Sequence, residues 1–246
     1  PNFEKFHPSS IVIAVGHAFF TLSIGMATIL TYASSLDKDT NIVKSSLIIV
    51  AMDTAIAIIA GLIIFSILFT SGAEPGKGAG LVFITLPAIF YEMGSVGNVL
   101  AVTFFVALAF AGITSAVSIL EPTVMYLVER LKISRQKATF TTMGALFFLG
   151  LLALLSNTTE FSAALTFGGK NLFDIFDFTS SAILMPLGGI LIAVFVGYVM
   201  DREIVESTLK PLMGNFFYSI WLISIRYITP IAITILMLKE IGILKI

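Results

Sequence analysis

Six long apolar stretches, separated by shorter polar segments, make up most of this chain. Each stretch is close to or above the length that crosses a hydrocarbon core of about 30 Å as a helix, which is about 20 residues. The pattern predicts an all-α membrane protein, with residues 1–246 forming a single transmembrane domain. The expected spans cover approximately residues 10–35, 42–70, 96–127, 138–155, 176–200 and 216–238.

Two of the connecting segments have a character of their own. Residues 78–93 are apolar enough to predict a short helix packed on the protein rather than a free loop. Residues 201–215 mix charges with leucine and methionine, which is typical of a helix at the membrane interface. Most lysines and arginines lie on the inner side if the chain starts outside, and the positive-inside rule favours that orientation.

The first stretch is weakest as a helix near its middle. Ser23 competes for backbone hydrogen bonds and Gly25 adds backbone entropy, so a spanning helix unwinds most easily there. Opened backbone at membrane depth persists only where it lines a cavity or binds something. Two interpretations stay open: a discontinuous helix around a binding site, or an ordinary span that tolerates a glycine.

Composition agrees with a membrane protein. The chain is 57% hydrophobic and 12% charged with a mean hydropathy of +1.02, whereas soluble domains are about 25% charged. A net charge of -1 gives no indication of nucleic acid as a partner, and the chain has no cysteine for disulfides, iron–sulfur clusters or thiolate metal sites. Because the first residues are polar and lack a methionine, we expect a piece of a longer protein.

Asp53 is the sharpest polar feature inside a span. It lies about twelve residues into the second stretch, roughly 18 Å deep at 1.5 Å per residue. A carboxylate at that depth costs about 2.5–3.5 kcal/mol and usually faces a partner or a wet cavity. The alternative is a protonated aspartate that is hydrogen bonded to a neighbouring helix.

Thr21 precedes the weak part of the first stretch at a comparable depth. A hydroxyl and a carboxylate at one level can surround a small hard cation, because such ions prefer oxygen ligands. His17 lies one turn earlier on the same helix face. For His17, a hydrogen-bonded packing role and a role as ligand or base both stay open.

A second group of oxygens lies in the third stretch. Hydroxyls at Thr114 and Ser115 reach back toward the carbonyl of Ala111 on one helix face, which forms half of a cation shell. The alternative is ordinary hydrogen bonding of these hydroxyls to their own helix.

Three strings of residues resemble the neurotransmitter:sodium symporter family. Residues 16–25 (GHAFFTLSIG) resemble its sixth spanning segment, residues 80–90 (GLVFITLPAIF) its extracellular loop four, and residues 111–115 (AGITS) its eighth segment. The match covers the whole chain as segments six to eleven and is closest to bacterial amino-acid transporters of the LeuT type. The resemblance implies the second half of an inverted-repeat transporter with a discontinuous first helix and a helical extracellular loop.

The resemblance also implies a function and a location. It implies sodium-coupled symport of a small neutral amino acid by alternating access in the cell membrane, and no enzymatic activity. Thr21 and Asp53 match ligands of the family's first sodium site, and Ala111, Thr114 and Ser115 match its second. The residues that match positions around the substrate are Phe20, Thr21, Ser23, Gly25, Met26, Ser115 and Ile119. Asp177 resembles the acidic half of the outer gate, and Glu129 that of the inner gate.

Four departures from the family pattern affect the interpretation. Asp53 stands where many members have asparagine, Ala57 stands where chloride-dependent members have serine, and His17 replaces a glutamine that is common near the chloride site. A fixed carboxylate at Asp53 supplies the negative charge that chloride otherwise brings, so we expect that chloride is not required. Ser35 stands where many relatives have a tyrosine at the inner gate, so how that gate closes is open.

The family's first five spans have no counterpart in this chain. Both sodium sites and the substrate site would be completed by that missing N-terminal half, so we expect residues 1–246 alone not to transport. Two alternatives of other classes remain at this stage. One is a structural or channel-like membrane subunit without a coupled site. The other is an intramembrane hydrolase that uses Asp53 as acid, or Ser115 and His17 as nucleophile and base.

Overall fold

The computed structural model describes residues 8–37, 39–72 and 80–244. The polar start of the chain and the first two residues of the expected loop helix, 78 and 79, therefore lie outside the described part. The chain divides into two compact units, one made of residues 1–45 with 119–246 and the other of residues 46–118.

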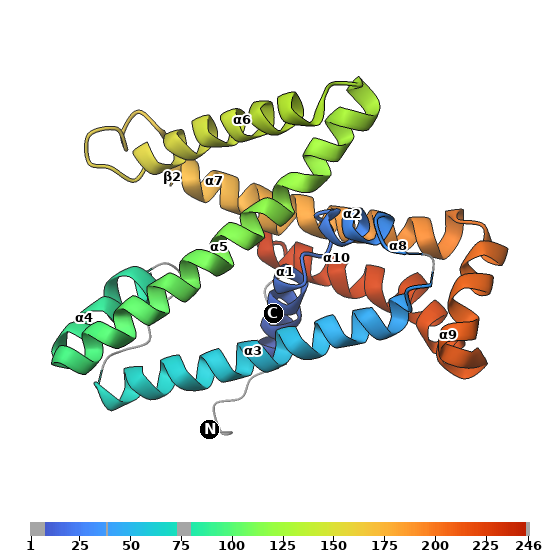
Figure 1. Ribbon diagram of the computed structural model, residues 1–246, viewed down its shortest axis with the longest axis horizontal. Helices are drawn as coiled ribbons and strands as arrows, with labels where there is room; N and C mark the ends of the chain where they lie inside the picture. Colours follow the sequence, from blue (N-terminus) through green and yellow to red (C-terminus); the bar gives the residue numbers. More distant parts are fainter. Residues whose placement is uncertain (1–7, 38, 73–79, 245–246) are drawn as a thin grey trace. The chain divides into compact units, whose positions relative to one another are not determined.

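The first unit consists of helices and one small hairpin (Figure 1). It contains the part of α5 (Gly94–Leu131) that follows Ser118. Its other elements are α1 (Pro8–Thr21), α2 (Thr28–Ser34), α6 (Arg135–Leu155), β1 (Thr166–Phe167), β2 (Lys170–Asn171), α7 (Leu172–Phe178), η3 (Thr179–Leu184), α8 (Met185–Val194), η4 (Phe195–Val199), α9 (Arg202–Ile223), η5 (Ser224–Ile228) and α10 (Thr229–Glu240).

The core of this unit lies between α8 and α10. Ala182, Met185 and Gly189 follow one helix face at spacings of three and four residues, and all are buried. From α10, Ile233 and Leu236 are buried as well. Helix α10 packs along α8, and α1 contacts α10, so α8 and α10 form the support on which the first helix rests.

Three π-helical turns each end two residues before a proline. They are η2 (Leu81–Thr85) before Pro87, η3 before Pro186 and η5 before Pro230. Proline lacks the N–H that the carbonyl four residues earlier needs, and its ring crowds that carbonyl. A turn with wider i→i+5 bonds absorbs this disturbance, so the helices continue through these prolines.

The second unit contains most of α3 (Ile42–Thr70), the turn η2, α4 (Leu86–Glu92) and the first part of α5. Leu86, Ile89 and Phe90 bury one face of α4, and the ring of Phe90 lies 6.0 Å from that of Phe104 on α5. A Cβ at Gly97 would lie 1.8 Å from the Phe90 carbonyl oxygen, so only glycine allows this contact. The expected helix of the loop is therefore present as α4.

Five helical segments of the described chain are long and apolar enough to cross a membrane. They are Ile42–Thr70, Gly94–Leu131, Arg135–Leu155, Leu172–Val199 and Arg202–Glu240. The first expected span differs because it is split into α1 with 14 residues and α2 with 7. The prediction of an all-α membrane fold with a discontinuous first helix is confirmed.

Two local features of the first unit add detail to the sequence prediction. Strands β1 and β2 pair antiparallel across Gly168 and Gly169, whose φ angles of 59° and 81° suit a tight hairpin turn. Helix α9 contains a kink at Gly214, with φ 76° and ψ 166°, which separates the polar residues before it from the apolar ones after it.

Candidate substrate and ion site at the broken helix

The main chain leaves the helix between Thr21 and Thr28. Three residues there have left-handed backbone angles: Ser23 with φ 53°, Gly25 with φ 90° and Ala27 with φ 61°. For residues with a Cβ such a conformation is strained by about 1–3 kcal/mol each, and it persists where the surrounding structure enforces it. We refer to residues 22–27 as the break.

Main-chain hydrogen bonds span parts of the break, but they do not restore a continuous helix. The Ile24 N–H donates to the Phe19 carbonyl at 3.2 Å, and the Met26 N–H donates to the Ser23 carbonyl at 3.4 Å. Within the described part of the chain, the carbonyl oxygens of Leu22, Ile24, Gly25 and Met26 accept no hydrogen bond. Open carbonyls at membrane depth suit an ammonium group or a bare cation, because nothing in lipid can satisfy them.

Helix α1 ends at the break and α2 begins after it, so the dipoles of both helices act there. The carbonyl end of α1 carries partial negative charge, which favours a cation beside Thr21. The amide end of α2 carries partial positive charge, although this helix has only 7 residues. A zwitterion, which carries one positive and one negative group, fits this arrangement better than a molecule without charged groups does.

The expected substrate residues between Phe20 and Met26 lie at or beside the break. Phe20 is 49% exposed at the end of α1, while Ser23, Gly25 and Met26 are half-buried. The Thr21 hydroxyl donates to the Ala18 carbonyl at 3.3 Å.

A cavity of about 250 Å³ lies in the same unit between α1, η3, α8 and α10. His17, Phe20 and Ser181 line it, with Glu240 at the end of α10. His17 thus faces a cavity.

The second unit carries the other expected sodium ligands. Asp53 is half-buried in the interior of α3. On α5, Ala111, Thr114 and Ser115 are exposed, and the Thr114 hydroxyl donates to the carbonyls of Phe110 at 3.1 Å and Ala111 at 3.0 Å. The alternative of bonding to its own helix therefore holds for Thr114.

The expected ligands are thus divided between the two units. Thr21 belongs to the first unit, whereas Asp53 and the Ala111–Ser115 group belong to the second. Their meeting at sodium ions stays a prediction. Ile119 follows Ser115 by one turn on α5 and is exposed.

The expected gate residues are both exposed. Asp177 lies on α7, where its carbonyl accepts hydrogen bonds from the Ser180 and Ser181 hydroxyls at 3.1 and 2.6 Å. Glu129 lies near the end of α5.

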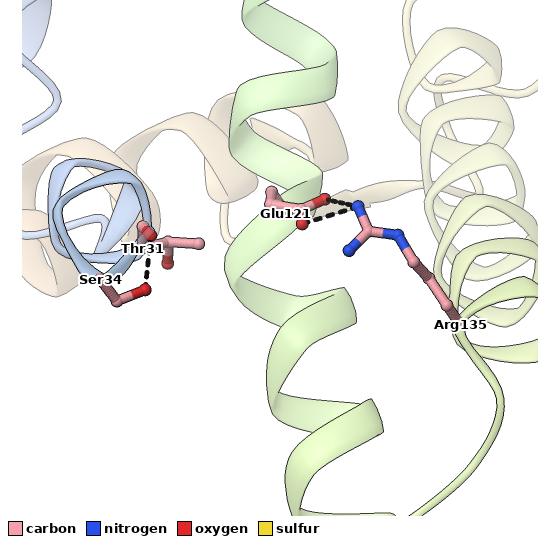
Figure 2. A network of polar contacts seen from close by, with 4 residues as sticks. All are labelled: Thr31, Ser34, Glu121 and Arg135. Atoms are coloured by element: carbon pink, nitrogen blue, oxygen red, sulfur yellow. Dashed lines mark hydrogen bonds and ion pairs between the residues drawn. The ribbon is translucent and has the colours of Figure 1, made fainter. Parts of the chain in front are cut away.

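An ion pair that the sequence did not predict joins Glu121 to Arg135 (Figure 2). Nη2 of Arg135 donates to both Glu121 carboxylate oxygens, at 2.8 and 2.9 Å. Helix α2 shows local hydrogen bonding in the same figure, where the Ser34 hydroxyl donates to the Thr31 carbonyl at 2.7 Å.

A second unpredicted contact involves Arg226 of η5. Its Nε donates to the Gly197 carbonyl at 2.6 Å, and the Tyr198 hydroxyl donates to the Arg226 carbonyl at 3.1 Å. That carbonyl needs an outside donor because Pro230 has no N–H to offer it. The sequence signal for this contact was an arginine inside an apolar span. Such residues are rare in membrane helices, and they usually pair with another polar group.

These features define a multi-pass membrane protein whose first helix opens to offer main-chain oxygens. The chain matches the Sodium:neurotransmitter symporter family over residues 1–245. It belongs to that family.

Two comparisons cover essentially the whole chain. It is 37% identical over 247 residues to an uncharacterized sodium-dependent transporter, YhdH, of Bacillus subtilis (strain 168), covering 100% of this chain and 54% of that protein. It is similar to the crystal structure of MhsT in complex with L-phenylalanine, with a TM-score of 0.83 and 34% identity over 98% of this chain and 54% of that one. The fold is that of the LeuT-type transporters, as the sequence predicted.

A more distant relative carries a substrate class in its name. The chain is 28% identical over 159 residues to the sodium-dependent nutrient amino acid transporter 1 of Drosophila melanogaster, covering 61% of this chain and 25% of that protein. The relatives are transporters, so this is not an enzyme, and the hydrolase alternative is rejected. The chain spans about half the length of YhdH and of MhsT.

Proposed function

We propose that the full-length protein containing this chain couples sodium entry to the uptake of a small neutral amino acid by alternating access. The observation that carries this proposal is the break, where the carbonyls of Leu22, Ile24, Gly25 and Met26 accept no hydrogen bond from any residue that the structure describes. Sodium dependence in the names of the relatives and L-phenylalanine in the MhsT structure support it.

Two sodium ions bind in this account. The Thr21 hydroxyl and the Asp53 carboxylate are side-chain ligands of the first, which suits a small hard cation. At the second, the Ala111 carbonyl and the hydroxyls of Thr114 and Ser115 provide half a shell. The Thr114 hydroxyl keeps its lone pairs for sodium while it donates to its own helix.

The substrate lies against the break with its ammonium toward open carbonyls. Phe20, Thr21, Gly25 and Ser115 adjoin its main-chain part. Ser23, Met26 and Ile119 bound its side chain, which favours a medium-sized neutral group. None of these three side chains carries a charge that could pair with a charged side chain of the substrate.

The mechanism also needs two gates and the N-terminal half of the protein. Asp177 serves the outer gate and Glu129 the inner gate, each with a cationic partner from the family's first repeat. That N-terminal half also completes both sodium shells. The protein works in the cell membrane, with the exposed apolar faces of α3 and α6 available to lipid or to that half.

Chloride is not required in this account. Asp53 carries a fixed negative charge, and Ala57 lacks the hydroxyl that a chloride site uses. Replacing chloride by gluconate in sodium-containing buffer should change uptake by the full-length protein less than about twofold, since no coupling free energy depends on chloride. A large loss of rate would reject chloride independence.

The central experiment measures uptake of radiolabelled neutral amino acids into proteoliposomes that contain the full-length protein. We expect uptake to need an inward sodium gradient and to fall at least about tenfold when potassium replaces sodium. The reason is that binding of the amino acid is coupled to binding of sodium. Asp53→Asn should keep partial uptake with altered sodium dependence. Uptake that ignores sodium would instead support the channel-like alternative. Proteoliposomes with residues 1–246 alone should show no sodium-dependent uptake.

A further inference from the structure

The break touches α8 more closely than side chains allow. A Cβ at Gly25 would lie 2.1 Å from the Met185 carbonyl oxygen, and a Cβ at Gly188 would lie 2.4 Å from the Gly25 carbonyl oxygen. Real Cβ atoms essentially never come within 3.0 Å of such neighbours. The two backbones therefore meet directly, and both positions require glycine.

Gly189 makes a second contact of this kind. A Cβ there would lie 2.4 Å from Cζ of Phe19, at the end of a side chain on α1. The Phe19 carbonyl accepts the hydrogen bond from the Ile24 N–H that reaches over the break, at 3.2 Å. The residue whose ring packs on Gly189 is thus also the residue whose carbonyl holds the Ile24 N–H of the break.

Glycine alone does not produce these contacts. At Gly144 and Gly150, both inside the apolar helix α6, an added Cβ would meet no heavy atom within 4 Å. Around the break, by contrast, Met185 and Gly189 are buried, and Thr28 is only 6% exposed with an unpartnered hydroxyl in the described structure. Helix α8 is thus a closely fitted support for the break.

We propose that Gly188 and Gly189 are positioning residues that set where the open carbonyls of the break lie, and thereby the affinity for sodium and substrate. Neither glycine touches a ligand in this account. The effect on affinity rests on the proposed function, whereas the control over the position of the break does not.

The size of the effect follows from the distances. Ordinary contact begins at 3.4 Å, so a methyl group added at Gly188 or Gly189 must displace its neighbour by about 1 Å. A displacement of about 1 Å can weaken a preorganised site by up to about 100-fold. At Gly189 the neighbour is a side chain that can be shortened, whereas at Gly188 it is main chain.

The first measurement is the half-saturating concentration of radioactive sodium for the full-length transporter, well below the unfolding temperature of each variant. Gly189→Ala should raise this concentration about tenfold or more, and Phe19→Leu in the same protein should bring it back to within about threefold of wild type. Gly144→Ala is the matched control and should leave it unchanged. A purely structural role would lower the unfolding temperature without this rescue of affinity.

The second measurement follows the break itself. The chain has no cysteine, so Ser23→Cys in a cysteine-free full-length protein introduces one thiol whose labelling rate reports the position of the break. Gly188→Ala and Gly189→Ala should change that rate, and Gly144→Ala should not.

Unchanged labelling and unchanged sodium affinity in folded variants, or no rescue by Phe19→Leu, would overturn the positioning role. If the wild type binds no sodium but the labelling rates change as expected, the proposed function fails and the positioning role stands.

Discussion

The break and the oxygen group of α5 were both expected to hold sodium, yet they are built differently. At the break, the oxygens are main-chain carbonyls without a hydrogen-bond donor in the described part of the chain, in a segment with three left-handed residues. On α5, the helix is continuous through Ala111, Thr114 and Ser115, and the Thr114 hydroxyl already bonds to its own helix. The first group depends on backbone shape and the second on side-chain chemistry.

This difference determines which substitutions matter in each region. Main-chain oxygens cannot be removed by changing a side chain, so the break is vulnerable at its glycine and at the glycines of α8 that fit against it. A hydroxyl on a continuous helix can be removed while the helix keeps its shape. We therefore expect glycine substitutions to change shape and affinity together, and hydroxyl substitutions to change affinity alone.

The largest effect is expected for Gly25→Ala in the full-length protein. Its φ of 90° is unfavourable for alanine, and the new Cβ would lie 2.1 Å from the Met185 carbonyl oxygen. The combined strain should destabilise the protein by about 3 kcal/mol or more and abolish sodium-dependent uptake. Thermal unfolding and uptake measure this, with Gly150→Ala as control. Normal uptake by Gly25→Ala would contradict the described break.

An intermediate effect is expected for Thr114→Val. Valine keeps the branched shape and the helix but removes one proposed ligand, so sodium affinity should fall about tenfold, equivalent to about 1.4 kcal/mol. The unfolding temperature in sodium-free buffer should stay within a few degrees, since the exposed hydroxyl bonds only to its own helix. Thr114→Ser, which keeps the oxygen, is the control. Equal affinity of all three proteins would remove Thr114 from the sodium site.

The smallest effect is expected for the pair of Glu121 and Arg135, which lies outside both compared regions. The Arg135 side chain is 65% exposed and that of Glu121 22%, so solvent screens their attraction. A double-mutant cycle with Glu121→Gln and Arg135→Gln should give a coupling energy of about 0.2–1 kcal/mol. Thermal unfolding at low and high salt measures it. A coupling energy several times larger would show that the pair stabilises the fold.

The residue pattern was sufficient for the helical architecture and for the weak point of the first span, whereas the family resemblance was needed to choose a discontinuous helix over an ordinary span. Long apolar stretches mark membrane helices, and Ser23 with Gly25 marks a weak point because both residue types disfavour helix. Nothing in the residue type indicates the left-handed angle of Ala27, whose φ is 61°. The small hairpin was also missed, although its Gly168–Gly169 pair is a local turn signal.

Contacts between distant segments were beyond prediction from one sequence. Gly188 and Gly189, like Gly144 and Gly150, lie inside an apolar helix, and only the structure shows that the break packs on the first two. The π-helical turns before Pro87, Pro186 and Pro230 show the same limit. A proline predicts a disturbed helix, but whether the helix bends or widens depends on its surroundings.

The most direct test of a sodium site formed by Thr21 and Asp53 is a crystal structure of the full-length protein with thallium in place of sodium. Thallium scatters anomalously, so its position can be read without assumptions about ligands. We predict an anomalous peak within coordination distance of the Thr21 hydroxyl and the Asp53 carboxylate, beside an open main chain at residues 22–27. No peak between these side chains, or an unbroken helix through Gly25, would contradict it.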